Sequence, residues 1–215
     1  NILLLSLLSL CTLAKTQSLQ PMSAMLIETD IRSYTLGGIG AVSPGYTKEA
    51  GLSQNPALIA EDEKRLYVNF SYFPFYSFSS MDNSEFELNH VCALKAIYSP
   101  GGKNTFGFNS VSHSFPPSVF HDLNGDEIKI KQRSLLFQLK YSRILSKHFT
   151  LGFGAKYFQL TKVANSSKNH VGKSVAFDLG ITYNTQFRLS DVSKLRLQFG
   201  SSICNLGTDI DINQG

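Results

Sequence analysis

The residues in this chain best suited to chemistry are four oxygen-bearing side chains in one polar loop. They are Asp122, Asn124, Asp126 and Glu127. Such a group could bind calcium, but an EF-type loop needs further oxygens and a distant bidentate glutamate, and both are missing here. Asn124-Gly125 is instead typical of a hairpin turn, which leaves the acidic groups in solvent. We therefore expect a turn here and no metal ion.

The other reactive residue types do not form a constellation. The five histidines are scattered, and the chain has no CxxC motif or histidine pair at metal-ligand spacing. No serine lies in a nucleophile elbow. Gly37-Gly38-x-Gly40 is not a dinucleotide fingerprint, because we expect no strand before it and no helix after it at the right spacing. The sequence therefore predicts no catalytic residue, no cofactor and no metal site, and we expect a protein that is not an enzyme.

The composition favours a protein with a large apolar surface. Only 17% of the 215 residues are charged, and 12% are aromatic, with 16 Phe, 9 Tyr and no Trp. Charged residues usually make up about a quarter of a soluble domain. The net charge of +4 is small, and the lysines and arginines are spread along the chain, which predicts no nucleic-acid face. An aromatic belt at a membrane interface would consist of Tyr and Phe.

Residues 1–18 are predicted to be a secretory signal peptide whose start is missing. Asn1–Leu13 is an apolar run, shorter than the roughly 20 residues that a membrane-spanning helix needs, and small residues follow it. Cys11 leaves a lipoprotein alternative, although Leu10 stands where a lipobox has a small residue. Both alternatives predict export. Cys92 and Cys204 lie in separate strand-like segments, and we expect no disulfide between them.

From Lys64 onward the dominant pattern is alternation of apolar and polar residues, which is typical of β-strands. In Leu135–Tyr141 the odd-numbered residues are apolar, while Gln138, Lys140 and then Ser142 face the other way, and Phe149–Tyr157 repeats the pattern. The same alternation recurs in five further segments: Leu66–Phe78, Phe86–Tyr98, Lys103–Ser114, Val175–Tyr183 and Leu195–Phe199. The sequence therefore predicts an all-β chain with about seven strands.

Two folds could use these strands. A soluble sandwich hides its apolar faces between sheets and has strands of about five or six residues. A transmembrane antiparallel β-barrel turns its apolar face to lipid and has strands of about nine to eleven residues. The long segments favour the barrel, as do glycines opposite the apolar face, which suit a packed or plugged lumen: Gly152, Gly154, Gly180 and Gly200. On that lumen side we expect Asp178 and Arg196 to form an internal pair.

The predicted connections alternate between short and long. Tight turns are expected at Ser99–Gly102 and Leu145–His148, and long polar loops at Phe115–Lys131 and around Asn165–Lys173. Short periplasmic turns and longer extracellular loops are typical of outer-membrane barrels. Thr185–Ser193 departs from the pattern, because it should be periplasmic but is long. With this orientation the N-terminal segment begins on the periplasmic side.

Ile31–Ala60 differs from the rest of the chain in being rich in small residues. Gly37, Gly38 and Gly40 permit close backbone approaches. Pro44-Gly45 and Gln54-Asn55-Pro56 predict turns, because the residue before proline is driven out of helical space. We expect this segment to fold into the lumen as a plug.

Seven strands are an odd number, whereas bacterial single-chain barrels have an even number. The chain also ends in Asp209–Gly215, which is polar and loop-like and has no terminal aromatic residue. We therefore expect that the sequence is the first half of a barrel and that a C-terminal half is absent.

Several of these segments together resemble the PorV/PorQ family of outer-membrane proteins. The resemblance lies in DIRSYTLGGIGAVS, LSQNPALIA and VNFSYFPFY near the start, then HDLNGDEIKI, KYSRILSKHFTLGFGAKYF, VAFDLGITYN and SSICNLGTDI in the family's order. It implies a half of a fourteen-stranded barrel related to the FadL fatty-acid transporters. The domains would be a signal peptide (1–18), an N-terminal hatch (19–62) and the first half of the barrel (63–215).

The resemblance implies a role in the type IX secretion system of the bacterial outer membrane. The protein would be either a PorV-like shuttle or a PorQ-like anchor component, and its partners would be outer-membrane lipid, the translocon and secreted cargo with C-terminal sorting domains. The alternative is a FadL-like transporter of hydrophobic small molecules. The family's hatch corresponds here to Gly37, Gly38, Gly40, Asn55, Pro56 and Ala57. The candidate extracellular partner loop contains Phe115, Pro116, Pro117, Phe120, Asp122, Asn124 and Asp126, with Asn165–Asn169 beside it.

Overall fold

A computed structural model describes most of the predicted strand region and a short part of the segment before it. The described residues are 49–60, 63–78, 86–115, 117–121, 127–164, 169–188, 194–208 and 211–213. The predicted signal peptide and the glycines Gly37, Gly38 and Gly40 lie outside these ranges.

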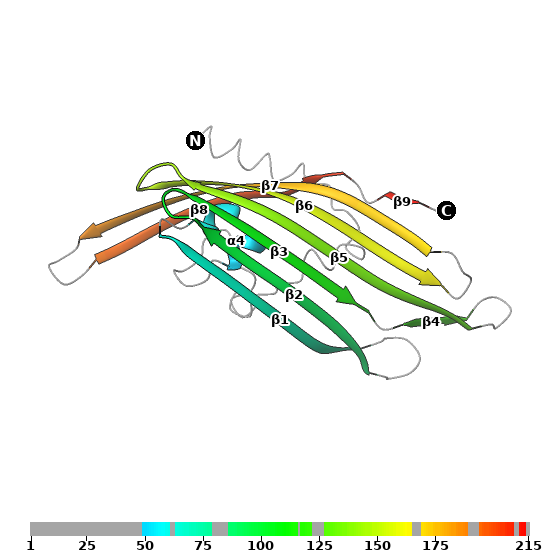
Figure 1. The fold of residues 1–215 in the computed structure, drawn as a ribbon. Helices are drawn as coiled ribbons and strands as arrows, with labels where there is room; N and C mark the ends of the chain where they lie inside the picture. The colour runs from blue at the N-terminus through cyan, green and yellow to red at the C-terminus, as the bar shows by residue number, and fades with distance from the viewer. Residues whose placement is uncertain are drawn as a thin grey trace, which may run out of the picture.

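Seven long strands form one antiparallel sheet in which each strand pairs with the next long strand along the chain (Figure 1). They are β1 (Arg65–Phe78), β2 (Phe86–Ser99), β3 (Asn104–Ser114), β5 (Glu127–Ile144), β6 (Phe149–Ala164), β7 (Asn169–Arg188) and β8 (Lys194–Gly207). The short strand β4 (Ser118–His121) pairs with β5, and β9 (Asp211–Asn213) pairs with β7. The prediction of an all-β chain with about seven strands is confirmed.

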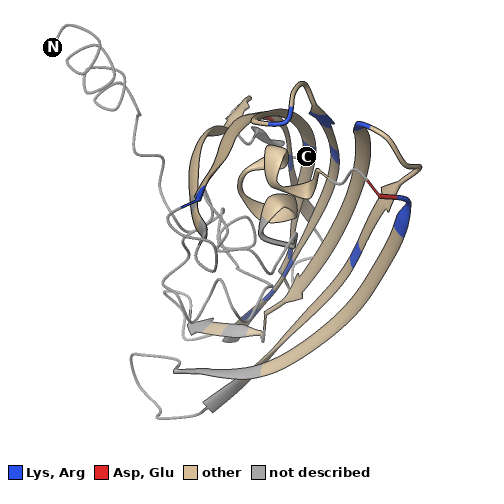
Figure 2. Ribbon diagram, turned by 90° about the vertical axis from the view of Figure 1, so that its left-hand side faces the viewer, with Lys and Arg blue, Asp and Glu red and all other residues tan. Residues whose placement is uncertain are grey.

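Two short helical elements lie against one face of the sheet. They are α4 (Glu49–Ser53) and the 3-10 helix η1 (Pro56–Ile59). Figure 2 shows the sheet curving around them, so that they lie on its concave side. We call this side the inner face and the opposite side the outer face. No described helix is long and apolar enough to cross a membrane.

Side chains alternate between the two faces along each strand, as their period of two requires. In β6, Gly152, Gly154, Lys156 and Phe158 are buried on the inner face, whereas Phe153 on the outer face is 44% exposed. The same alternation of buried and more exposed residues is found in β2, β3, β5 and β7. The inner face therefore carries the packed interior, and large apolar side chains lie on the outer face.

The inner face is arranged in rows that cross the strands. One row is apolar and consists of Ala93, Val111, Leu136 and Phe158, which are register neighbours on β2, β3, β5 and β6. These residues belong to one buried hydrophobic cluster, against which Phe73 of β1 packs. The next row toward the short turns is polar and contains Lys95, Asn109, Gln138 and Lys156. Asn109 Nδ2 donates a hydrogen bond to Gln138 Oε1 at 3.0 Å, which links two strands of this row.

Both predicted tight turns are found, and they lie at the same end of the strands. Gly101 and Gly102 connect β2 to β3 with φ angles of 94° and 85°, which a residue with a side chain rarely adopts. Between β5 and β6, Ser146 Oγ accepts hydrogen bonds from the amides of His148 and Phe149 at 3.2 and 3.1 Å. The serine thus replaces part of the lost strand pairing within the turn.

Four predicted segment boundaries are wrong. The Phe115–Lys131 segment is largely a hairpin, because β4 pairs with the start of β5 and only residues 122–126 connect them. β7 begins at Asn169 and runs to Arg188, which shortens the two connections expected at its ends. The Asp209–Gly215 segment contains β9 where a loop was expected. In all four places backbone pairing with a neighbouring strand extends the ladder through residues without clear apolar alternation.

Phe158 provides a test of which face carries the packed interior. It is fully buried on the inner face, so we expect Phe158→Ala to lower the free energy of unfolding by about 3–5 kcal/mol. Phe153→Ala on the same strand is the matched control, since its ring is already 44% exposed and should cost much less. Denaturant unfolding measures both variants, and equal losses would contradict the assignment of the faces.

Candidate functional site

The Asn55–Ala57 segment lies buried against the inner face of the sheet. Asn55 has an extended backbone, and its Oδ1 accepts a hydrogen bond from the amide of Ala57 at 3.0 Å. This makes Asn55 the N-cap of η1, and Pro56 follows at the first helical position, where its missing N–H costs nothing. The Asn-Pro-Ala sequence therefore specifies its own turn locally.

Two glycines of the sheet make room for this turn. Gly152 on β6 and Gly180 on β7 are register neighbours. A Cβ atom on Gly152 would collide with the backbone of Pro56 and Ala57, and one on Gly180 would collide with Oδ1 of Asn55. The expectation that these glycines suit a packed inner space is confirmed for both. No side chain larger than hydrogen fits at either position while the turn is seated.

Polar contacts hold the segment to three strands. Asn55 Nδ2 donates to the carbonyl oxygens of Ile181 on β7 and Ser201 on β8, at 3.3 and 3.4 Å. Ser142 Oγ on β5 donates to the carbonyl oxygen of Ala57 at 3.4 Å. Cys204 Sγ on β8 donates to the carbonyl oxygen of Gln54 at 3.0 Å.

Apolar side chains also hold the two helical elements against the sheet. Leu52 of α4 and Ile59 of η1 are fully buried and form a cluster with Ile97 of β2. Gly107 on β3 lies beneath Leu52 and Ile59, and a Cβ atom there would come within 3.0 Å of Ile59 Cδ1. The two helical elements therefore dock through both hydrophobic contacts and hydrogen bonds. We call residues 49–60 the docked segment.

A buried ionic cluster lies next to the docked segment on the inner face. Asp178 Oδ2 on β7 is 3.2 Å from Lys140 Nζ on β5 and 2.9 Å from Lys156 Nζ on β6. Gly154 lies between Lys140 and Asp178 in the register, and its lack of a side chain lets the lysine reach across β6. All three charged side chains are almost completely buried. A carboxylate shared by two ammonium groups leaves this cluster with a net positive charge.

The same carboxylate stabilises an irregularity in β8. The register of β7 and β8 shifts between Phe177 and Leu179, opposite Asn205, which has a φ of 61°. Asp178 Oδ1 accepts a hydrogen bond from the amide of Asn205 at 2.9 Å, and Lys156 Nζ donates to the side-chain oxygen Oδ1 of Asn205 at 2.8 Å. Asparagine is one of the few residues that tolerate this backbone conformation, so this β-bulge is specified by the sequence.

The predicted pair of Asp178 and Arg196 is wrong. Arg196 pairs with Gln186 near the opposite end of β7, and Asp178 is occupied by the two lysines. The sequence reasoning placed Lys140 and Lys156 on the correct face but did not bring them together with Asp178. The signal that could have found the cluster is three charged residues on the inner faces of three successive strands.

The described part of the predicted partner loop extends the sheet beyond β3. Phe115 donates its amide proton to the carbonyl oxygen of Gln132 at 3.0 Å, and its ring contacts the ring of buried His113 at a centroid distance of 3.7 Å. Val119 of β4 is 50% exposed. Pro117 and the backbone of Phe120 are described, whereas Pro116, Asp122, Asn124 and Asp126 lie outside the described residues.

The described cysteines and histidines form no reactive group. Cys92 and Cys204 are both free thiols, as expected. Within the described ranges no three His, Cys, Asp or Glu side chains gather in a way that could hold a metal ion. The arrangement on the inner face is suited to blocking the space beside the sheet and to fixing the docked segment in place.

Comparison with known proteins does not assign the chain to a family, since no family model matches it and no curated protein is significantly similar in sequence.

Gly180→Ala tests whether the Asn55–Ala57 turn needs the space that this glycine leaves. We expect the added methyl group to displace Asn55, because it would collide with Oδ1 of that residue. Hydrogen exchange at the amide of Ala57 should accelerate by about fivefold, in line with the roughly 1 kcal/mol that an N-cap contributes. Ile181→Ala is the control, since that side chain lies on the outer face. Unchanged exchange in the glycine variant would contradict the close contact between Asn55 and Gly180.

Asp178→Asn tests the ionic cluster. The substitution leaves two buried ammonium groups without a counter-charge, and we expect the free energy of unfolding to fall by about 3–5 kcal/mol. The double variant Lys140→Met with Asp178→Asn removes one of those charges and should recover part of the loss. Denaturant unfolding of both single variants and the double variant provides the coupling energy. Strictly additive effects would exclude the cluster.

Proposed function

We propose that the protein is an outer-membrane β-barrel component of the type IX secretion system that handles secreted cargo with C-terminal sorting domains. The observation that carries the proposal is the inverted distribution of polarity over the sheet. Charged and polar side chains are buried on the inner face, including Lys95, Lys140 and Asp178, while large apolar side chains cover the outer face. This distribution is opposite to that of a sheet whose outer face meets water.

The outer face presents apolar residues on every long strand. Exposed examples are Phe70, Leu94, Phe106, Leu139, Phe153, Leu179 and Phe199. A contiguous apolar surface of this extent is unusual in a soluble monomer and is typical of a membrane-facing or partner-covered surface. The strands are also long enough to cross a bilayer at a tilt, for which about nine to eleven residues suffice. These features support a barrel wall in contact with outer-membrane lipid.

Aromatic side chains gather near the short turns of the outer face. The ring centroids of Phe149 and Tyr183 are 4.8 Å apart, and those of Tyr183 and Phe199 are 6.5 Å apart. At the same end of the sheet, the ring centroids of Phe106 on β3 and Tyr141 on β5 are 5.4 Å apart, and Tyr141 OH donates to Asn104 Oδ1 at 2.8 Å. Tyrosines with an apolar ring and a bonded hydroxyl suit the interface between lipid and water.

The docked segment supports a role in which recognition occurs outside the inner space. Its turn lies directly against Gly152 and Gly180, where even an added Cβ atom would collide with it. A protein whose interior is blocked in this way would contact its partners through the loops at the far end of the strands. The hairpin that begins at Phe115 and includes β4 is the described part of that end.

The step from a plugged barrel to type IX secretion rests on the sequence resemblance described above. Asn55-Pro56-Ala57 corresponds to the hatch of that family, and its buried position supports the correspondence. The proposed protein is not an enzyme and needs no cofactor. Whether it acts as a PorV-like shuttle or as a PorQ-like anchor depends on its partners, which are the translocon and secreted cargo.

A FadL-like transporter of hydrophobic small molecules is the second candidate. The observation that favours it is the bulge in β8, which interrupts regular pairing next to the docked segment. Cys204 in this bulge contacts Gln54 of the docked segment. An irregular strand beside a plug could form a lateral passage, so the bulge connects the two features that such a transporter needs.

Affinity capture of the intact protein distinguishes the two functions. The tagged protein is extracted with detergent from the outer-membrane fraction of its native cells, and co-purifying proteins and lipids are identified by mass spectrometry. We expect secreted proteins with the C-terminal sorting domain, or the translocon, to be recovered. Replacing the β4 hairpin, residues 115–126, by a short glycine-serine linker should abolish their recovery.

The same experiment can also contradict the proposed function. Absence of the protein from the outer-membrane fraction would overturn the barrel. Its presence there without either class of protein partner, but with bound fatty acids, would overturn the secretion role in favour of the transporter. Phe153→Ala, on the outer face away from the hairpin, is the control that should leave partner recovery unchanged.

A further inference from the structure

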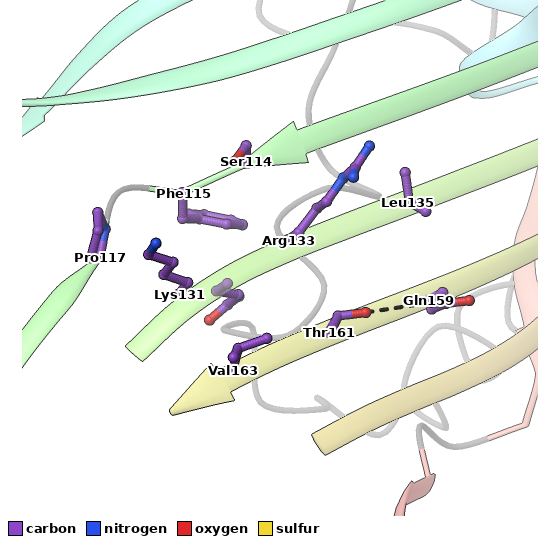
Figure 3. Close-up of a pocket in the computed structure, with 10 residues that line it drawn as sticks. Ser114, Phe115, Pro117, Lys131, Arg133, Leu135, Gln159, Thr161 and Val163 are labelled. Atoms are coloured by element: carbon purple, nitrogen blue, oxygen red, sulfur yellow. Dashed lines mark hydrogen bonds between the residues drawn. The ribbon is translucent and has the colours of Figure 1, made fainter. Parts of the chain in front are cut away.

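A pocket of about 420 Å³ lies on the outer face of the sheet beside the β4 hairpin (Figure 3). Its walls include Lys131, Arg133 and Leu135 of β5, together with Gln159, Thr161 and Val163 of β6. These residues face one another in the register, since Lys131 pairs with Val163, Arg133 with Thr161 and Leu135 with Gln159. The volume lies within the range of about 300–1,000 Å³ that is usual for small-molecule sites.

The polar groups of the pocket are ordered by contacts between neighbouring strands. Arg133 Nη2 donates to Ser112 Oγ on β3 at 3.4 Å. Tyr157 OH donates to Gln159 Oε1 at 3.1 Å, and Gln159 Nε2 donates to Thr161 Oγ1 at 3.4 Å. Figure 3 shows this last bond, with Arg133 and Lys131 extending from the adjacent strand. The pocket thus combines two cations with a chain of neutral hydrogen-bonding groups.

The electrostatic character of the pocket is positive. Among the described residues that line it, Lys131 and Arg133 are charged and none is a carboxylate. A guanidinium fork and an ammonium group are each suited to phosphate oxygens, which accept charge-assisted hydrogen bonds from both kinds of donor. Gln159 and Thr161 can exchange hydrogen bonds with hydroxyl groups.

The pocket continues into the apolar part of the outer face. Leu135 of β5 and Val163 of β6 form its apolar walls. The next outer-face residues after Leu135 along β5 are Phe137 and Leu139, which are 41% and 64% exposed. A ligand that fits this sequence of surfaces has an anionic, hydroxylated head and a hydrocarbon tail that extends toward the short turns.

We propose that this pocket binds the phosphorylated sugar head of a glycolipid in the outer leaflet of the membrane, of the lipid A class. Arg133 and Lys131 contact a phosphate, Gln159 and Thr161 contact sugar hydroxyls, and an acyl chain lies over Leu135 and Phe137. The assignment rests on the proposed barrel, in which the loop end of the strands faces outward. A protein segment is a poorer fit, since the pocket is small and charged on one side only.

The test measures binding of purified diphosphoryl lipid A to the intact detergent-solubilised protein by native mass spectrometry. We expect Lys131→Gln with Arg133→Gln to weaken binding by about tenfold or more, because two charge-assisted contacts are lost. Fully dephosphorylated lipid A should bind much more weakly than the diphosphoryl form, because the phosphate contacts are lost. Inorganic phosphate should compete only at far higher concentration, since it lacks the acyl chain.

Arg143→Gln is the matched control, because Arg143 is exposed on the same strand and the same face but lies near the short turns. Equal loss in this control, or unchanged binding in the double variant, would overturn the assignment. So would a double variant that keeps the lipid but no longer captures protein partners, since this would make the pocket a protein-docking site. If the wild-type protein is found in the outer membrane but does not bind lipid A, only this inference fails. Its absence from that membrane would defeat the proposed function as well.

Discussion

The backbone of Asn55–Ala57 can contact the sheet only where the sheet has no side chains. Gly152 and Gly180 provide this space at one register position shared by β6 and β7. Around it, the inner face supplies hydrogen-bond partners from β5, β7 and β8 and an apolar contact from β2. The pair of glycines next to the ionic cluster therefore follows from one steric requirement. The glycines are needed for close approach and not for an unusual backbone conformation.

The ionic cluster gives two buried lysines of the inner face the counter-charge that they need. Lysines on the inner face would be costly to bury alone, because a desolvated ammonium group needs a counter-charge and hydrogen bonds. Asp178 supplies the charge to Lys140 and Lys156, and its other oxygen binds the amide of Asn205. One carboxylate thus connects three strands and a β-bulge. Replacing a buried ion pair by apolar residues is often neutral for stability. Here the carboxylate also bonds to the residue at which the register of β7 against β8 shifts.

Strand number, face assignment and the position of the Asn-Pro-Ala turn could be predicted from the sequence, because each depends on local patterns. Apolar alternation in Leu135–Tyr141 and Phe149–Tyr157 determines which side chains share a face, and an asparagine before a proline specifies its own cap. Asn124-Gly125 indicated a hairpin between β4 and β5, but the extent of that strand pairing and the ends of β7 could not be predicted. They depend on backbone pairing with a neighbour, to which residues such as Thr185 and Gln186 contribute no clear apolar signal. The ionic partners of Asp178 depend on the register of three strands, which no single segment encodes.

The contacts of the docked segment also have a consequence for the order of folding. Every long strand pairs with the next one along the chain, so the sheet can grow by adding one hairpin after another. Asn55 instead bonds to carbonyl groups 126 and 146 residues further along the chain, at a register pair of β7 and β8. The loop that must close before these bonds form is therefore very long, and its entropic cost is met only when the strands on its far side are already ordered. The docked segment is synthesised before the strands but reaches its place only after β7 and β8 have paired.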